Sequence, residues 1–243
     1  MKKILTLLLL LTTLSMADFI GGEVNVGYYN HSPSGTSTYD GDTIEIEKDL
    51  KLKDKADLFL KAYIEHPLPI IPNIKVAYTS FSHKGNGVID NSFVWGDKSF
   101  RIGSQLESHF DLDIYDVALY YEILDNWLNA DVGINIKYID SSIGASSRTL
   151  DESAKFTLPI PMLYAKARLD IPTTDLSFQV EGNYLSYNDH KFYDVEAGAR
   201  YTFMLGFGVE VGYKALNLTI ENIDDTSFDA DFSGLYGKLV WDF

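Results

Sequence analysis

Gly234-Leu-Tyr-Gly-Lys-Leu-Val-Trp-Asp-Phe243 is the stretch that decides the fold. Its residues alternate, so an extended strand has one apolar side and one mixed, largely polar side. The apolar side holds Leu235, Gly237, Leu239, Trp241 and Phe243. In water such a strand is an aggregation hazard, because its apolar side and its edge are unprotected. One interpretation is nevertheless an edge strand of a soluble sandwich. In a membrane barrel its apolar side meets lipid, and Trp241 and Phe243 join an aromatic girdle.

Residues 1–17 distinguish these two interpretations. Lys2 and Lys3 precede the apolar run 4–11, and Ser15-Met-Ala17 is a small-x-small site. These are the three parts of a secretory signal peptide, so we expect cleavage after Ala17. The run is too short for a transmembrane helix, which needs roughly 20 residues. The predicted domains are therefore a signal peptide, 1–17, and one barrel domain, 18–243.

Composition narrows the function classes. The chain has no Cys, which excludes disulfides, thiolate metal sites and a cysteine nucleophile. Its net charge is -15, and loss of Lys2 and Lys3 leaves 18 basic against 35 acidic residues, a charge of about -17. That balance argues against nucleic acid as a partner, because phosphates require a basic surface. It suits loops that meet divalent cations and lipopolysaccharide.

Strand-like alternation recurs along the chain. We expect ten strands, near residues 20–28, 58–65, 74–79, 116–124, 128–138, 163–171, 176–184, 193–203, 207–214 and 234–243. Long polar connections, notably 30–56 and 82–109, alternate with tight turns, as in outer-membrane barrels with long extracellular loops. We expect 93–102 to extend a strand pair above the membrane, and a bulge near Ala215. The predicted fold is a ten-stranded antiparallel transmembrane β-barrel, with eight or twelve strands as alternatives.

The two faces of these strands differ in charge. The outward face carries no charged residue in the chosen register, and aromatic residues gather at both strand ends, as interfacial belts do. The inward face is charged. Residues predicted to line the lumen are Lys61, Lys75, Glu122, Asp131, Lys137, Lys166, Arg168, Asp170, Glu181, Glu196, Arg200, Glu210, Lys214 and Lys238.

The sequence resembles the small outer-membrane β-barrel proteins of Gram-negative bacteria, specifically a family of unassigned function. The resemblance rests on the signal peptide, the proline turn 67–73, the hairpin 120–126 and the terminal Trp241-Asp-Phe243. That terminus is similar to the signal read by the barrel assembly machinery, with Gly237 as a departure from the usual larger apolar residue. The resemblance implies an integral outer-membrane location, lipid and lipopolysaccharide as neighbours, and periplasmic chaperones during biogenesis.

Three functions stay open from the residues alone. A mixed-charge lumen in a narrow barrel favours a filled, structural interior, while interior glycines leave a narrow conduit as an alternative. A hydrolase at the outer rim has candidates in His83, His109 with Asp111 and Asp113, and Asp189-His190, without a recognisable enzyme motif. The third is a surface binding module built from the two long loops.

No cofactor or metal site is predicted. Asp40, Asp42, Glu45, Glu47 and Asp49 have oxygen ligands suited to calcium, but their spacing does not fit an EF-hand loop. A solvated acidic loop is the preferred interpretation. We expect a monomeric, non-enzymatic barrel.

Overall fold

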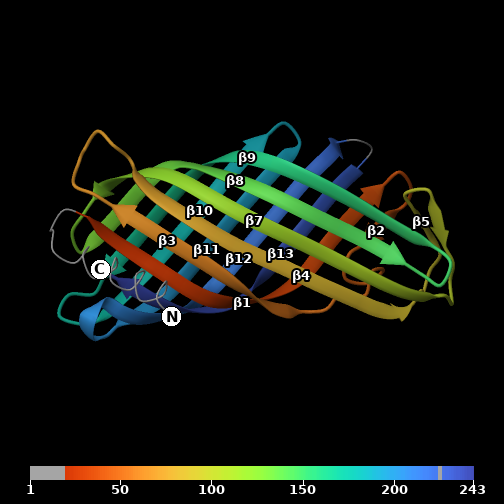
Figure 1. The fold of residues 1–243 in the computed structure, drawn as a ribbon, viewed down its shortest axis with the longest axis horizontal. Coiled ribbons are helices and arrows are strands. Elements are labelled where there is room, and N and C mark those ends of the chain that lie inside the picture. Colours follow the sequence, from red (N-terminus) through yellow and green to blue (C-terminus); the bar gives the residue numbers. More distant parts are fainter. Residues whose placement is uncertain (1–19, 224–225) are drawn as a thin grey trace, which may run out of the picture.

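The computed structural model describes residues 20–223 and 226–243; the predicted signal peptide lies outside this part of the chain. Ten antiparallel strands form a barrel that closes because β13 pairs with β1 (Figure 1). The wall strands are β1 (Gly21–Tyr39), β3 (Lys55–Glu65), β4 (Asn73–Val88), β7 (Gln105–Leu124), β8 (Leu128–Ser146), β9 (Asp151–Asp170), β10 (Leu176–Tyr187), β11 (His190–Thr202), β12 (Phe207–Ile223) and β13 (Thr226–Asp242). The predicted fold class is therefore confirmed.

Tight turns join the strands at the near end, which we define as the end where β1 begins and β13 finishes, with Glu23 opposite Asp242. The turn between β11 and β12 contains the 3-10 segment η2 (Met204–Gly206). Gly206 has φ +75°, and a Cβ there would lie 1.8 Å from the carbonyl oxygen of Asp242. Only glycine fits this backbone next to the last strand.

At the far end the strands run well beyond their predicted limits. β1 continues to Tyr39 and pairs with the short β2 (Thr43–Glu45), while β4 continues to Val88 and β7 begins at Gln105. The predictions of long exposed loops at 30–56 and 82–109 were thus partly wrong. The strand pair expected at 93–102 exists as a hairpin of β5 (Phe93–Trp95) and β6 (Lys98–Phe100), in a sheet separate from the wall.

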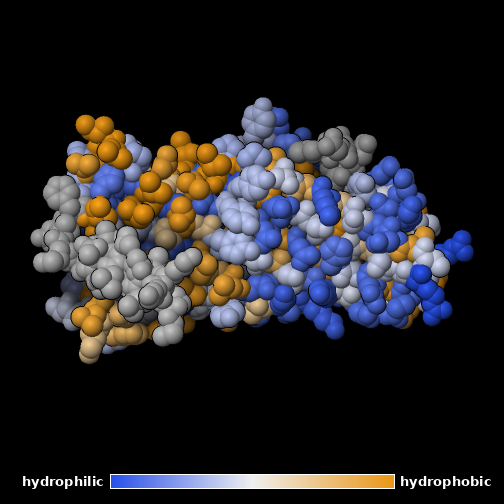
Figure 2. Space-filling model, in the orientation of Figure 1, coloured by the Kyte–Doolittle hydropathy of each residue, from blue (hydrophilic) through white to orange (hydrophobic). Residues whose placement is uncertain are grey.

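In the long wall strands, such as β1, β7 and β12, the apolar residues change from the outward face to the inward face along the strand. Toward the near end the exposed outer residues are apolar, for example Val26, Val117 and Val211. We call this ring of exposed side chains the apolar band. Toward the far end the outer surface is mostly polar, and the apolar residues point inward. Figure 2 shows this division as an orange half and a largely blue half.

Aromatic side chains border the apolar band on both sides. The far rim consists of Tyr28, Tyr78, Tyr115, Tyr138, Tyr184, Tyr193 and Tyr213, and the near rim of Tyr121, Trp127, Tyr201, Phe203, Phe207, Trp241 and Phe243. Neighbouring rings touch, as Tyr78 and Tyr115 do at 5.0 Å and Phe207 and Trp241 at 5.8 Å between centroids. Within the described residues, no helix is long and apolar enough to cross a membrane.

The prediction of a bulge near Ala215 was wrong. β12 and β13 stay in continuous register from Phe207 to Ile220, and the irregularity falls between Ile220 and Ile223. The pattern near Ala215 changes for another reason. Inward residues of β12 switch there from polar Lys214 to apolar Leu216, without any change of register.

On one side of the barrel the wall extends less far toward the far end, because β10 and β11 are short. β10 and β11 end in a short hairpin at Tyr187 and His190, and β10 pairs with β9 only as far as Leu163. The far half of β9 therefore has β8 as its partner on one side and no paired strand on the other. Pro159 and Pro161 stand in this stretch, where the missing backbone N–H suits an unpaired edge. We call this gap in the wall the notch.

Candidate functional site: the lumen

The lumen beside the apolar band is filled by a balanced set of charges, which we call the polar network. It contains seven acids and seven bases, each at most 8% exposed: Glu23, Asp116, Asp131, Glu181, Asp194, Glu196 and Glu210, with Lys61, Lys75, Lys137, Lys166, Arg200, Lys214 and Lys238. Buried charges are costly unless they are paired. Because the acids and bases are equal in number, each buried charge can have a partner of opposite sign.

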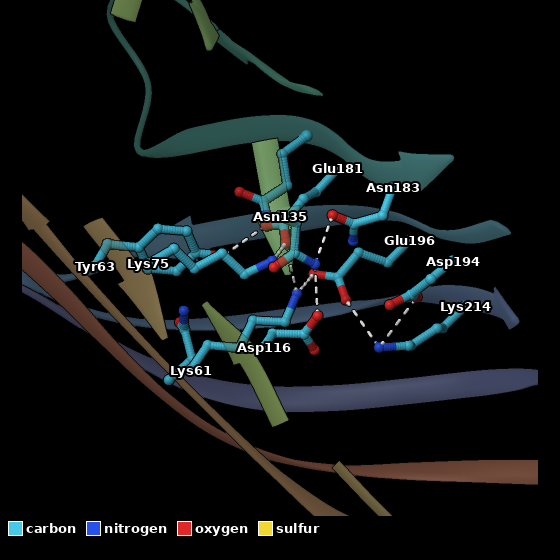
Figure 3. A network of polar contacts seen from close by, with 12 residues as sticks. Lys61, Tyr63, Lys75, Asp116, Asn135, Glu181, Asn183, Asp194, Glu196 and Lys214 are labelled. Carbon is cyan, nitrogen blue, oxygen red and sulfur yellow. Dashed lines mark hydrogen bonds and ion pairs between the residues drawn. The ribbon is translucent and has the colours of Figure 1, made fainter. Parts of the chain in front are cut away.

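Glu181 lies at the centre of this network, on β10 (Figure 3). Its carboxylate accepts hydrogen bonds from Lys61 at 3.1 Å, from Tyr63 at 2.5 Å and from Lys75. Lys61 and Lys75 stand on β3 and β4, which are not neighbours of β10 in the wall. These contacts therefore cross the lumen and hold opposite walls together.

A second centre is Arg200, on β11. Its guanidinium binds both carboxylate oxygens of Glu23, at 2.8 and 3.0 Å, and its Nε donates to Glu210 at 3.1 Å. Gln179 accepts from Arg200 and donates to Glu210. A planar guanidinium that engages two carboxylates uses its fixed fork geometry fully.

The third centre joins Lys137 to Asp116 at 2.6 Å and to Asp194 at 3.0 Å, with Lys214 at 3.3 Å from Asp194. Asn135 donates to both Asp116 and Asn183, linking this group to β10 (Figure 3). The three centres together place side chains across the lumen, and their low exposure shows that little solvent reaches them. The arrangement fits a plug better than a water-filled path.

The structure places eleven of the fourteen predicted lumen residues in the polar network. The other three lie toward the near mouth: Glu122 is exposed, and Arg168 and Asp170 are half-buried and 3.3 Å apart. The uncharged partners Tyr63, Gln179 and Asn135 were not assigned a role from the sequence. Their signal was available, since each occupies the same face of its strand as a predicted lumen residue.

Beyond the polar network, toward the far end, the lumen is filled by an apolar core. It includes Tyr29, Phe59, Phe81, Phe110, Leu112, Ile114, Ile139, Ile143, Phe192, Leu216, Leu218, Phe228 and Phe232. Ile44, Ile46, Leu50 and Leu52, from the segment predicted to be a loop, are at most 4% exposed and join this cluster, as does Trp95 of β5. We call this cluster the upper core. It makes the far half of the barrel a packed module.

Two histidines are embedded in the upper core, beyond the far rim. His31 and His83 are buried with ring centroids 4.7 Å apart, among Tyr29, Phe81 and Phe232. His83 Nδ1 lies 2.8 Å from the carbonyl oxygen of Lys53, and His31 Nε2 lies 3.4 Å from Asp57.

The other candidate histidines lie elsewhere. His109 faces outward on β7, with Nε2 3.4 Å from the Ser142 hydroxyl. His190 lies at the notch, where its Nδ1 accepts from the Glu221 backbone at 3.2 Å. The three hydrolase candidates are therefore at three separate places in the fold.

Burial lowers the pKa of His31 to about 4, with the neighbouring His83 adding to the shift and Asp57 opposing it. Burial likewise lowers the pKa of His83. An ordinary histidine has a pKa near 6.5. His31 is therefore neutral in the folded protein at pH 7, and protonation favours the unfolded state.

We expect this pair to make the far half sensitive to acid. The stability contributed by neutral His31 is present above about pH 6.5 and is lost as pH falls toward about 4, by on the order of 2–3 kcal/mol. The folded fraction in graded urea, measured by gel mobility at pH 7.5 and 4.5, tests this. His31→Gln should reduce the pH dependence, and His109→Gln should leave it unchanged. Equal pH dependence in all three proteins would contradict the assignment.

The acidic segment at 40–49 is structured. Asp42 accepts from the Val94 backbone at 2.8 Å, which ties this segment to β5, and Asp49 accepts from the Glu45 backbone at 2.8 Å. Within the described part of the chain, no group of three or more His, Asp or Glu is arranged to hold a metal ion. These two carboxylates are thus used to satisfy backbone donors.

Comparison with known proteins identifies the fold. The outer-membrane protease OmpT of Escherichia coli superposes with a TM-score of 0.61 at 12% identity, covering 94% of this chain and 98% of that one. The fold is that of an outer-membrane β-barrel. The translocator domain of the autotransporter NalP from Neisseria meningitidis gives 0.49 at 12% identity, over 100% and 95% of the two chains. Ail of Yersinia pestis, in complex with a heparin analogue, gives 0.42 at 11% identity, over 92% and 99%.

Of these three likenesses, the first alone has a TM-score above 0.5, so the comparison of folds rests on it. Identities this low show fold and not activity. No family model and no curated protein matches the sequence. The narrower resemblance to a barrel family of unassigned function therefore stays a prediction.

Proposed function

We propose that this protein is a non-conducting barrel of the outer membrane that anchors a rigid extracellular module. The observation that carries the proposal is the polar network, which fills the lumen beside the apolar band with seven acids and seven bases. An ion crossing this region would have to displace several buried ion pairs at once. Such displacement is costly in a low-dielectric interior.

The apolar band supports placement in a bilayer. Exposed apolar side chains bordered by two aromatic rims match the lipid-facing surface of transmembrane barrels. The near end, with its tight turns, would face the periplasm, and the far half would stand outside the cell. Location in the outer membrane accordingly remains part of this proposal.

The far half supports the second part of the proposal. An anchor alone needs strands only as long as the membrane is thick, about 9–11 residues. Here β7 and β9 have 20 residues each, and the excess encloses the upper core. A packed core holds the outer surface in a fixed shape, which suits presentation of a binding surface.

We expect the purified protein to produce no conductance steps in planar lipid bilayers in concentrated KCl. The reason is that the polar network and the upper core block the lumen in series. The measurement is single-channel current over a range of voltages, with a known porin as the positive control. Stepwise conductance that scales with added protein and disappears after heat denaturation would overturn the proposal.

Insertion must be verified in the same preparation. Arg148 and Thr149 are exposed in the far-end connection between β8 and β9, so an epitope inserted between them should be tolerated. Antibody access to this epitope on intact cells, together with a heat-dependent shift in gel mobility, shows that the barrel is folded and inserted. An epitope reached only after lysis would contradict the proposed orientation.

A further inference from the structure

The notch leads into an apolar cavity that the proposed function does not use. The cavity has a volume of about 180 Å³ and lies between the unpaired edge of β9 and the β10–β11 hairpin. Its inner wall is formed by Ile160, Leu185, Phe192, Leu218 and Ile220. Apart from Leu185, which packs against the upper core, these residues belong to it. The cavity is therefore an opening into the upper core through the side of the barrel.

The mouth of this cavity lies just beyond the far rim. β9 and β10 stop pairing at Leu163 and Tyr184, and Tyr184 and Tyr193 are rim residues. Aromatic rims mark the level of lipid headgroups. The mouth thus faces the zone where the polar ends of amphiphiles lie.

The composition of the mouth indicates what can enter. Pro159 and Pro161 line it and offer no backbone donors, so addition of a protein strand to this edge is disfavoured. Lys191 also lines it, on the outward face, with its Nζ 5.3 Å from the Tyr193 ring centroid. The mouth therefore combines a cation on the outside with an apolar cavity on the inside.

The size of the cavity limits the ligand. An engineered apolar cavity of about 150 Å³ in another protein accommodates one benzene molecule. A cavity of about 180 Å³ is thus suited to the end of one hydrocarbon chain and too small for several chains. A lipid A molecule, whose several acyl chains are anchored in the leaflet, fits poorly.

We propose that the notch binds a single-chain fatty-acid carboxylate. Its tail enters the cavity beside Leu185, Phe192 and Leu218, and its carboxylate pairs with the Lys191 ammonium at the mouth. This site is independent of whether the lumen conducts ions. No covalent step is involved.

The test is equilibrium binding of radiolabelled decanoate to the full-length protein in phosphatidylcholine nanodiscs, with protein-free nanodiscs subtracted. We expect saturable binding with one site per barrel. Leu185→Trp fills the half-buried side of the cavity and should weaken binding at least tenfold. Leu239→Trp, on the exposed apolar band, is the matched control and should leave binding within twofold of the wild type.

The carboxylate contact has its own test. Lys191→Glu should weaken decanoate binding at least fivefold and change decan-1-ol binding by less than twofold. Lys84→Glu, at an exposed outward position of β4, is the charge-matched control. Each variant must keep the heat-dependent gel shift of the wild type, which separates loss of the site from loss of the fold.

Three outcomes would overturn the proposal. The first is decanoate binding no greater than in empty nanodiscs. The second is equal binding by the Leu185→Trp and Leu239→Trp proteins. The third is displacement of bound decanoate by lipid A in the disc, which would assign the notch to a leaflet lipid.

Discussion

Replacing Glu181 with alanine is expected to lower the free energy of unfolding by about 3–5 kcal/mol, because one buried partner of an ion-pair group is removed. Glu181 accepts hydrogen bonds from Lys61, Lys75 and Tyr63, and its side chain is 1% exposed. Without it two ammonium groups stay buried with fewer counter-charges. The measurement is the urea midpoint of the folded fraction in detergent, from gel mobility or tryptophan fluorescence.

Two further variants separate charge from packing. Glu107→Ala, at an exposed position of β7, should change the free energy of unfolding by less than about 0.5 kcal/mol. Replacing Glu181 and Lys75 together by leucine and methionine should recover part of the loss, because an apolar pair leaves fewer unpaired charges. If Glu181→Ala behaves like Glu107→Ala, the polar network does not hold the barrel together.

Placing a lysine on the apolar band should be the second large effect. Val211 is 64% exposed and lies between the two rims on β12. If hydrocarbon surrounds it, Val211→Lys should cost roughly 2–4 kcal/mol, as lysine does near the midplane of transmembrane barrels. If water surrounds it, replacing an exposed valine by lysine should be nearly neutral. The urea midpoint in lipid vesicles measures the difference.

Thr157→Lys is the matched control for that substitution. Thr157 is exposed on the outward face of β9, beyond the far rim. A lysine there should be tolerated, since we place that surface in water. Equal costs at Val211 and Thr157 would contradict a bilayer around the apolar band.

The sequence predicted the half of the barrel that lies beside the apolar band. Outward Val117 and Leu119 alternate with inward Asp116 and Glu122, a pattern with one interpretation in a closed barrel. The proline turn at 67–72 and the turn at Asp125 and Asn126 fixed where strands end. Strand number and the face of each lumen residue follow from these local rules.

The far half was missed because its pattern is inverted. In β7 the alternation runs without a break, but the apolar positions change face: Phe110, Leu112 and Ile114 point inward, whereas Tyr115 and Val117 point outward. We interpreted the polar outer residues of this half as loop. The inversion is the mark of a barrel that leaves the membrane for water while keeping its strands, and it is visible in the sequence once it is sought.

The partners within the lumen were beyond sequence reasoning for a different reason. Lys61 and Glu181 are 120 positions apart and stand on strands that do not pair. Which side chains meet across a barrel depends on its diameter and on the stagger of its strands. The notch depends likewise on the hairpin of β10 and β11 being shorter than its neighbours, and hairpin length is predicted poorly where polar residues continue a strand.

The pairing of β1 with β13 has a consequence for the order of folding. Glu23 pairs with Asp242 and Tyr39 with Thr226. The wall strand that is synthesised first therefore lies beside the wall strand that is synthesised last. Without β13, β1 would have no strand to pair with on that side. The edges of β1 and β12 would both stay unpaired and open to pairing with other chains. Closure of the barrel must therefore wait until β13 has been synthesised, whatever the order in which the other strands pair.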